Sequence, residues 1–234
     1  MKITNKSTID SWSNFTNEDL ANFGDDGDSA RKYLIDPVIF DLAGNIKNKL
    51  VLDAGCGNGY FSRKLAHEGA KVTGVEPSIN LFNYCIKKEN QDSLGIAYLQ
   101  QDLSELEIDK QFDTVLLINV LMDIPDYKSA LQNCVTTLKP GGEIIISILH
   151  PAFPGFEKDW SSLGHVQITE YFNAEPVKQK YGFFFPRPLS TYINDLISMG
   201  CNINRLVEPQ LSGSAEESRN KHIPQFLIIK ATKN

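Results

Sequence analysis

The sequence predicts an α/β protein built on a Rossmann-like, seven-stranded and mostly parallel sheet, with helices on both faces and an antiparallel hairpin at its carboxyl-terminal edge. Two observations point to this class. From residue 49 onward, short and continuously apolar segments alternate with amphipathic ones, as in parallel strands covered by helices on both sides. The length of 234 residues fits one large domain that needs no disulfide to stabilise its core.

Five apolar segments are the predicted strands of the core, which we place at residues 49–150. They cover residues 49–55, 71–77, 96–102, 112–119 and 143–149. Amphipathic helices are predicted over residues 58–66, after the N-cap candidate Ser78, and over residues 127–138, where apolar side chains recur at helical spacing. The segment KPGG at 139–142 is predicted to be the turn that separates this last helix from the fifth strand.

Residues 187–234 are predicted to complete the core sheet. Pro188 opens a helix that Gly200 ends. A weak strand at 201–207 and a stronger one at 225–231 follow, and no convincing helix separates them. This arrangement predicts the antiparallel hairpin at the sheet edge.

Two segments lie outside this core. Residues 1–48 are predicted to form a helical cap or lid, in which Pro37 starts a helix that stops at Gly44. Residues 151–186 have no clear period, and we interpret them as an insertion. It forms either a local hydrophobic cluster or a substrate lid with apolar walls. Its aromatic residues are Phe153, Phe156, Trp160, Phe172, Tyr181, Phe183, Phe184 and Phe185.

Composition narrows the classes of partner. The four cysteines are widely spaced without a CxxC pair, so we expect reduced thiols in a cytoplasmic protein and no metal site. No apolar run reaches membrane-spanning length, and we expect no membrane association. Because the net charge is −6 and no Lys/Arg run is present, nucleic acid is not expected as a partner.

A glycine-rich loop follows the first predicted strand, where residues 53–59 read DAGCGNG. Glycine lets the backbone approach a ligand closely and adopt positive φ angles. Glu76 ends the second strand 21 residues after Gly55, where a carboxylate can accept both hydroxyl protons of an adenosine ribose. Ligands of parallel sheets bind beyond the carboxyl ends of the strands, so these residues indicate a nucleotide-type site.

The charge of the loop bears on which nucleotide it binds. Its spacing is GxGxG, with Tyr60 where a dinucleotide-binding loop has its third glycine. Asp53 precedes the first glycine, and its carboxylate repels a diphosphate but not an ammonium or a sulfonium. The charge therefore favours an adenosyl cation over NAD, with a nicotinamide-dependent oxidoreductase as the alternative.

Five motifs resemble, in order and spacing, those of class I S-adenosylmethionine-dependent methyltransferases. The matching stretches lie between about residues 49 and 151 and read VLDAGCGNGYFS, VTGVEPS, QQDL, FDTVLLINVLMDIPD and LKPGGEIIISILHP. The stretches SILHPAF and RPLSTYINDLISMG further resemble the branch that acts on small molecules, similar to methyltransferase types 11 and 12. The resemblance implies S-adenosylmethionine as cofactor and S-adenosylhomocysteine as its product.

The resemblance also implies roles at the methionine end of that cofactor. Gly55 and Gly57 would pass under the methionine portion, with Asp53 near its amino group. Asn119, at the end of the fourth strand, would lie near the same end.

At the adenosine end, the resemblance assigns the ribose hydroxyls to Glu76 and a position beside the adenine to Pro77. Asp102 would accept from the adenine amino group, with the backbone of Leu103 alongside. Arg31 and Tyr33 fall in a segment that closes the pocket in similar proteins, but they are given no definite role.

The implied reaction transfers a methyl group to an oxygen or nitrogen atom of a small, apolar or aromatic metabolite. A general base is needed only if this atom arrives protonated. His150, at the end of the fifth strand, is the candidate base, although it equally suits a hydrogen bond to the following turn. The candidate pocket residues for the acceptor are Trp12, Phe15, His165 and Tyr171.

Two other interpretations complete the sequence-based picture. Asp123 and Asp126 precede a predicted helix and are interpreted as its caps. The segment GDDGDS at 24–29 lacks the distal Glu of a calcium loop. A non-catalytic protein that binds S-adenosylmethionine stays open as a further alternative, because catalysis by alignment needs no signature residue.

Overall fold

A seven-stranded sheet in the order β3-β2-β1-β4-β5-β9-β8 forms the centre of the computed structural model, which describes residues 2–152, 170–211 and 222–234. Neighbouring strands are parallel from β3 to β5, while β9 is antiparallel to both β5 and β8. The sequence-based fold class and its edge hairpin are therefore confirmed. The strands are β1 (Leu50–Ala54), β2 (Lys71–Val75), β3 (Ala97–Leu99), β4 (Phe112–Ile118), β5 (Leu138–Leu149), β8 (Cys201–Val207) and β9 (Phe226–Lys233).

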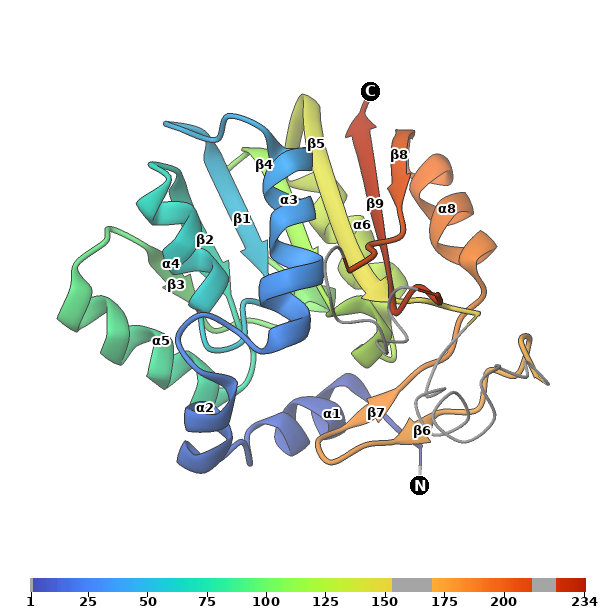
Figure 1. Ribbon diagram of the computed structural model, residues 1–234, viewed down its shortest axis with the longest axis horizontal. Helices are drawn as coiled ribbons and strands as arrows, with labels where there is room; N and C mark the ends of the chain where they lie inside the picture. The colour runs from blue at the N-terminus through green and yellow to red at the C-terminus, as the bar shows by residue number, and fades with distance from the viewer. Residues whose placement is uncertain (1, 153–169, 212–221) are drawn as a thin grey trace.

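Helices cover both faces of this sheet (Figure 1). Successive residues of a strand point to opposite faces, and β5 divides its isoleucines accordingly. Ile144 and Ile146 pack in the cluster that contains α6 and α8, whereas Ile145 packs in the cluster that contains α3, α4 and α5. The helices are α3 (Asp36–Ala43), α4 (Tyr60–His67), α5 (Ile79–Asp92), α6 (Tyr127–Thr136) and α8 (Leu189–Ser198).

The N-terminal segment crosses the carboxyl ends of the parallel strands, beside the hairpin of β6 (Val177–Lys178) and β7 (Phe183–Phe184) (Figure 1). It contains α1 (Asn5–Trp12) and α2 (Asn17–Phe23), and a turn of π-helix, η1 (Arg31–Ile35), then leads into α3. Capping boxes at Thr4 and Thr16 start α1 and α2, and satisfy backbone N–H groups that a short helix leaves free. Both helices are thus locally encoded.

The KPGG segment and the Ser78 cap each differ in one respect from the sequence-based expectation. The KPGG segment is not a separating turn, because β5 begins at Leu138 and pairs with Phe112 before the register shifts to Thr114 opposite Glu143. The positive φ of Gly141 (74°) accommodates this bulge within the strand. Ser78 does hold the N-cap position of α5, but its side chain accepts no hydrogen bond from the helix.

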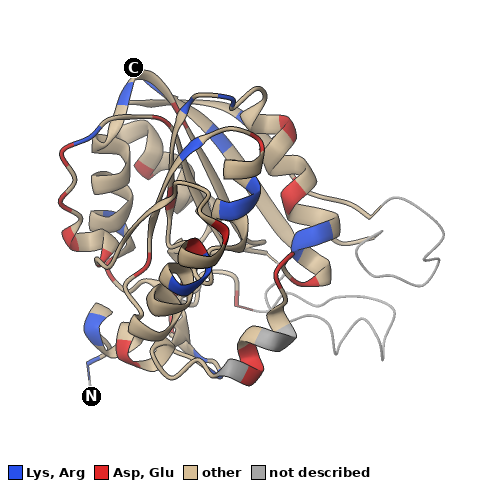
Figure 2. Ribbon diagram, turned by 90° about the vertical axis from the view of Figure 1, so that its left-hand side faces the viewer, with Lys and Arg blue, Asp and Glu red and all other residues tan. Residues whose placement is uncertain are grey.

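Of the predicted insertion, residues 151–152 and 170–186 belong to the described part of the chain, while Phe153, Phe156, Trp160 and His165 lie outside it. Within the described ranges, no helix is long and apolar enough to span a membrane. On the side of the molecule that Figure 2 presents, Lys and Arg segments lie among Asp and Glu segments.

Candidate active site

A cavity of about 350 Å³ lies at the carboxyl ends of β1 to β4, where the strand order reverses between β1 and β4. Such reversal points are where open α/β sheets bind ligands. All eight residues predicted to contact the cofactor line this cavity, as do the acceptor candidates Trp12 and Phe15. The cofactor candidates are Asp53, Gly55, Gly57, Glu76, Pro77, Asp102, Leu103 and Asn119.

The glycine loop between β1 and α4 is fixed against the sheet. The N–H groups of Gly55 and Cys56 both donate to the carbonyl of Val75, at 2.8 and 2.9 Å. Gly55 has a φ of 77°, and a Cβ on it would lie 2.6 Å from a methyl carbon of Val120. Glycine is favoured at this position, because a side chain would be strained in the left-handed conformation and would collide with Val120 unless that residue shifted.

The Glu76 carboxylate is tied to this loop at the cavity wall. Its Oε2 accepts the N–H of Gly57 at 2.9 Å, and its Oε1 accepts the N–H of Ser78 at 2.8 Å. The side chain is buried, and burial raises its pKa to about 7, although the two backbone N–H groups oppose that shift. Each oxygen retains a lone pair, so the carboxylate can accept hydrogen bonds from ligand hydroxyls.

Asp53 is the second buried carboxylate of the loop. Its Oδ2 accepts the hydroxyl proton of Ser62, on α4, at 2.5 Å. Burial raises the pKa of Asp53 to about 6, and its partner is a neutral hydroxyl rather than a cation. A cationic ligand group placed here would stabilise the charged carboxylate.

Asp102 follows β3 and is joined to the N-terminal segment. Its Oδ1 accepts the N–H of Ser104 at 2.9 Å, and the amide of Asn5 donates to its Oδ2 at 3.2 Å. The same Asn5 side chain accepts the N–H of Asp126 at 3.0 Å. Asn5 was not predicted as a site residue, and it connects α1 to the loop after β3 and to the start of α6.

An aromatic cluster of Trp12, Phe15 and Tyr181 closes one side of the cavity. The ring centroids lie 5.2 to 6.1 Å apart. The Tyr181 hydroxyl donates to Asp19 of α2 at 2.6 Å, and the Gly182 N–H donates to Ser11 of α1 at 2.7 Å. The β6–β7 hairpin therefore holds the N-terminal helices in place.

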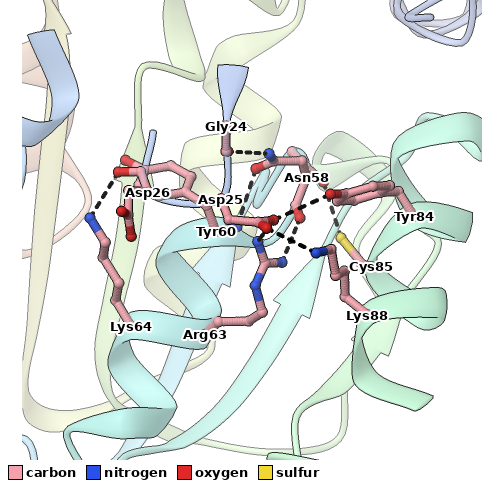
Figure 3. A network of polar contacts seen from close by, with 11 residues as sticks. Gly24, Asp25, Asp26, Asn58, Tyr60, Arg63, Lys64, Tyr84, Cys85 and Lys88 are labelled. Atoms are coloured by element: carbon pink, nitrogen blue, oxygen red, sulfur yellow. Dashed lines mark hydrogen bonds and ion pairs between the residues drawn. The ribbon is translucent and has the colours of Figure 1, made fainter. Parts of the chain in front are cut away.

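The acidic segment after α2 is anchored on the other side of the glycine loop, as Figure 3 shows. Asp25 receives hydrogen bonds from Lys88 at 3.0 Å, from Tyr84 at 3.3 Å and from Arg63 at 3.4 Å. Lys64 donates to the carbonyl of Asp26 at 2.9 Å. These contacts fasten the segment to α4 and α5.

Asp123 is a cavity residue that the sequence analysis interpreted as a helix cap, and that interpretation was wrong. Asp126 is the N-cap of α6, with its side chain accepting the N–H of Ser129. Asp123 instead ends the short 3-10 helix η3 (Leu121–Asp123) and lines the cavity. Burial raises its pKa to about 7, while Arg31 and Arg187 oppose the shift.

The remaining candidates are not on the cavity wall formed by the described residues. His150 is buried between the turn that follows β5 and Glu208. Its Nδ1 accepts the N–H of Ala152 at 3.2 Å, and its Nε2 lies 2.9 Å from the Glu208 carboxylate. The hydroxyl of Tyr171 accepts the N–H of Leu189 at 2.9 Å. The geometry thus supports the turn-stabilising interpretation of His150.

Parts of the chain are similar in sequence to known methyltransferases. Residues 52–146 match the family model described as a methyltransferase domain. A ubiquinone biosynthesis O-methyltransferase of Coxiella burnetii is 34% identical over 155 residues, which cover 61% of this chain and 66% of that protein. The enzyme of the same name from Salmonella enteritidis is 31% identical over 114 residues, covering 48% of this chain and 47% of that protein. The chain thus aligns with less than two thirds of these relatives' length.

The fold of most of the chain is similar to that of solved methyltransferase structures. An S-adenosylmethionine-dependent methyltransferase from Listeria monocytogenes superposes with a TM-score of 0.71 at 26% identity, covering 85% of this chain and 97% of that one. One from Mesorhizobium loti gives a TM-score of 0.76 at 24% identity, covering 90% and 100%. The magnesium protoporphyrin IX methyltransferase of Synechocystis, solved with bound S-adenosylmethionine, gives 0.60 at 20%, covering 98% and 93%.

Proposed function

We propose that this chain is a class I S-adenosylmethionine-dependent methyltransferase that transfers a methyl group to an oxygen or nitrogen atom of a small molecule. The observation that carries the proposal is the cavity at the strand-order reversal, whose walls combine the glycine loop with Glu76 and Asp102. The acceptor is an apolar or aromatic metabolite, because aromatic rings line the N-terminal side of the cavity.

The polar groups of the cavity fit the hydrogen-bond donors of S-adenosylmethionine. Among the described lining residues there are four carboxylates (Asp53, Glu76, Asp102, Asp123) and one cationic side chain, Arg31. Hydroxyls, an exocyclic amine and an ammonium are the groups that such carboxylates bind. Arg31, from η1, supplies the matching partner for the cofactor's carboxylate.

Each assigned residue then has a defined task in binding. Glu76 accepts from the ribose hydroxyls through the lone pairs that its two backbone donors leave free. Asp102 accepts from the adenine amino group beside the backbone of Leu103, and Pro77 lies along the ring. Asp53 faces the ammonium of the methionine end, where Gly55 lets the chain pass closely.

The reaction rests on alignment and exclusion of water. The cofactor supplies a methyl carbon made electrophilic by a sulfonium. The protein's own contribution is to hold the acceptor atom in line with that carbon and to exclude water with the aromatic wall of Trp12 and Phe15. Such positioning lowers a barrier by roughly 7–11 kcal/mol in favourable cases. The curated relatives are named O-methyltransferases, which favours oxygen as the acceptor atom.

The alternative of a nicotinamide-dependent oxidoreductase is disfavoured by the position of Asp53. Its carboxylate lies at the first glycine of the loop, with Glu76 close behind, and no lining cation offsets the pair except Arg31 among the residues described. A diphosphate placed over this loop would meet two carboxylates.

Titration calorimetry distinguishes these functions. We expect S-adenosylhomocysteine to bind and NADH not to bind, and the reverse result would refute the proposal. A methyl-transfer assay against phenols, catechols and amines, with mass spectrometry locating the added methyl group, separates an enzyme from a non-catalytic binding protein. Transfer to none of these classes, with binding intact, would favour the binding protein.

A further inference from the structure

The Asp123 carboxylate differs from the other carboxylates of the cavity. Three of these carboxylates accept hydrogen bonds from the protein. Asp53 accepts from Ser62, Glu76 from Gly57 and Ser78, and Asp102 from Ser104. Within the described part of the chain, no hydrogen bond or ion pair to the Asp123 carboxylate is present. Asp123 is half-buried in the cavity wall, where a desolvated charge without a partner is costly, so a ligand group is the natural partner for this one.

Arg187 holds the backbone on both sides of Asp123. Arg187, just before α8, donates to the carbonyls of Leu121 at 2.8 Å and Ile124 at 2.6 Å, on either side of Asp123. Its guanidinium also stacks on the ring of Tyr127, 3.9 Å from the centroid. A clamped 3-10 turn presents the carboxylate from a fixed position, which catalysis and recognition both require.

The same turn begins against the glycine loop. Val120, the residue before η3, fills the space that a Cβ on Gly55 would need. Gly55 is assigned to the methionine end of the cofactor, so η3 starts beside the end that carries the methyl group. Asp53, Glu76 and Asp102 are assigned to the cofactor's own donors, whereas Asp123 is left for the acceptor.

We propose that Asp123 binds the acceptor's reacting hydroxyl or amino group and takes its proton during methyl transfer. The inference rests on the proposed function. For a hydroxyl acceptor, the oxygen forms a bond to the methyl carbon while the carbon–sulfur bond breaks with its electron pair on sulfur. The O–H bond breaks at the same stage, and its proton passes to the Asp123 carboxylate and then to water. The products are a methyl ether and a thioether.

The charges around Asp123 suit this role. Arg31 faces it from η1 and Arg187 from the segment before α8, and the buried Tyr192 of α8 also lies in its electrostatic surroundings. Burial outweighs the two arginines and raises the pKa of Asp123 to about 7. A base with such a pKa is ionised often enough at neutral pH and still accepts a proton readily.

Sinefungin tests the position of Asp123 without any acceptor. This analogue carries an ammonium-bearing carbon in place of the methyl sulfonium, so its charge marks the place of the transferred methyl group. At pH 8 we expect wild-type protein to bind sinefungin about tenfold more tightly than S-adenosylhomocysteine, the value of one charge-assisted hydrogen bond. Asp123→Asn should bring the ratio of the two Kd values to about one and leave the Kd for S-adenosylhomocysteine within about twofold.

The ratio is the readout because Asp53 and Glu76 also have raised pKa values and affect both ligands alike. In wild-type protein the preference should diminish from pH 8 to pH 6, as the Asp123 carboxylate takes up its proton. Asp126→Asn is the matched control: it makes the same change three residues away, outside the cavity wall, and Asn also caps helices well.

The outcomes separate this inference from the function on which it rests. An unchanged ratio in Asp123→Asn, or a wild-type ratio of one, with S-adenosylhomocysteine binding intact, overturns the inference alone. Failure of wild-type protein to bind either compound overturns the proposed function and this inference with it. A collapse of the ratio in the Asp126→Asn control would likewise count against Asp123.

Discussion

Replacing Glu76 by Gln tests the ribose-binding assignment. In the wild type, the two carboxylate oxygens accept the N–H groups of Gly57 and Ser78 at 2.9 and 2.8 Å. A Gln amide offers one acceptor oxygen, so its NH₂ group would face one of these donors in a site that is only 6% exposed. The variant therefore loses a hydrogen bond to the loop and a charged acceptor for the ribose.

The two consequences have different magnitudes. Burial raises the pKa of Glu76 from 4.5 to about 7, which means that ionising Glu76 in the ligand-free wild type lowers the free energy of unfolding by about 3 kcal/mol. Gln avoids this cost, which offsets the roughly 1.5–3 kcal/mol of the lost charged hydrogen bond. We therefore expect a free energy of unfolding close to wild type at pH 8. Binding has no such compensation, and one lost charge-assisted hydrogen bond weakens S-adenosylhomocysteine binding about 10- to 150-fold.

Titration calorimetry at pH 8 measures this loss, and urea denaturation checks the fold. Glu89→Gln is the matched control, because Glu89 on α5 also accepts a backbone N–H, that of Gly95 at 2.7 Å, but does not line the cavity. A Glu76→Gln protein that binds S-adenosylhomocysteine with the wild-type Kd would refute the ribose assignment.

Three further outcomes are expected. Gly55→Ala should abolish cofactor binding and lower Tm, because the alanine would adopt a left-handed conformation, which costs about 1–2 kcal/mol, and its Cβ would lie 2.6 Å from Val120. Gly95→Ala is the control: Gly95 is also left-handed but has open space around it, so this variant should only lower Tm. The unfolding free energy of the ligand-free protein, measured by urea titration, should fall from pH 5 to pH 8. In the folded protein the pKa values of Asp53 and Glu76 are raised to about 6 and about 7. The stability that comes from a raised carboxyl pKa disappears as pH rises through that value. Stability that grows over this range would contradict the assignment of buried carboxylates. His150→Ala should lower the unfolding free energy by about 1 kcal/mol and leave methyl-transfer rates unchanged, whereas a tenfold slower rate would restore His150 as a base.

Much of the fold can be predicted from the sequence because short apolar runs mark the strands. The segment at 112–119 contains the apolar run Val115–Ile118, and β4 spans Phe112–Ile118. The cofactor wall is similarly accessible to sequence reasoning, since Gly55 and Glu76 directly follow their strands and parallel strands bring those ends together.

The acceptor side is harder to predict because it depends on contacts between distant segments. Asn5 donates a hydrogen bond to Asp102, which lies 97 positions away in the sequence, and no local sequence pattern predicts that contact. Asp123 and Asp126 carry the same side chain three residues apart, yet one faces the cavity and the other caps α6. Which of them does so depends on the η3 turn, which Arg187 fixes from far along the chain.

His150 directly follows a strand but does not line the cavity formed by the described residues. Its position after β5 predicted a place at the ligand edge, as for Asn119 after β4. However, β5 is bordered by the antiparallel β9, and the His150 N–H donates to the carbonyl of Gln225 at 2.9 Å. The end of β5 is therefore occupied by sheet contacts, away from the strand-order reversal.

The N-terminal helices and their fastenings have a consequence for the timing of the reaction. A molecule that fills the cavity lies between the glycine loop and α1, whose Asn5 and Trp12 line the wall. The ties that hold this cover include the ion pairs of Asp19 with Lys180 and of Asp25 with Lys88, in each of which one partner is solvent-exposed, and such pairs contribute little each. The cover can therefore release while the sheet stays folded. If the cavity binds the cofactor as proposed, its entry and the departure of the product both require this cover to open, so we expect release of S-adenosylhomocysteine to contribute to the rate of turnover.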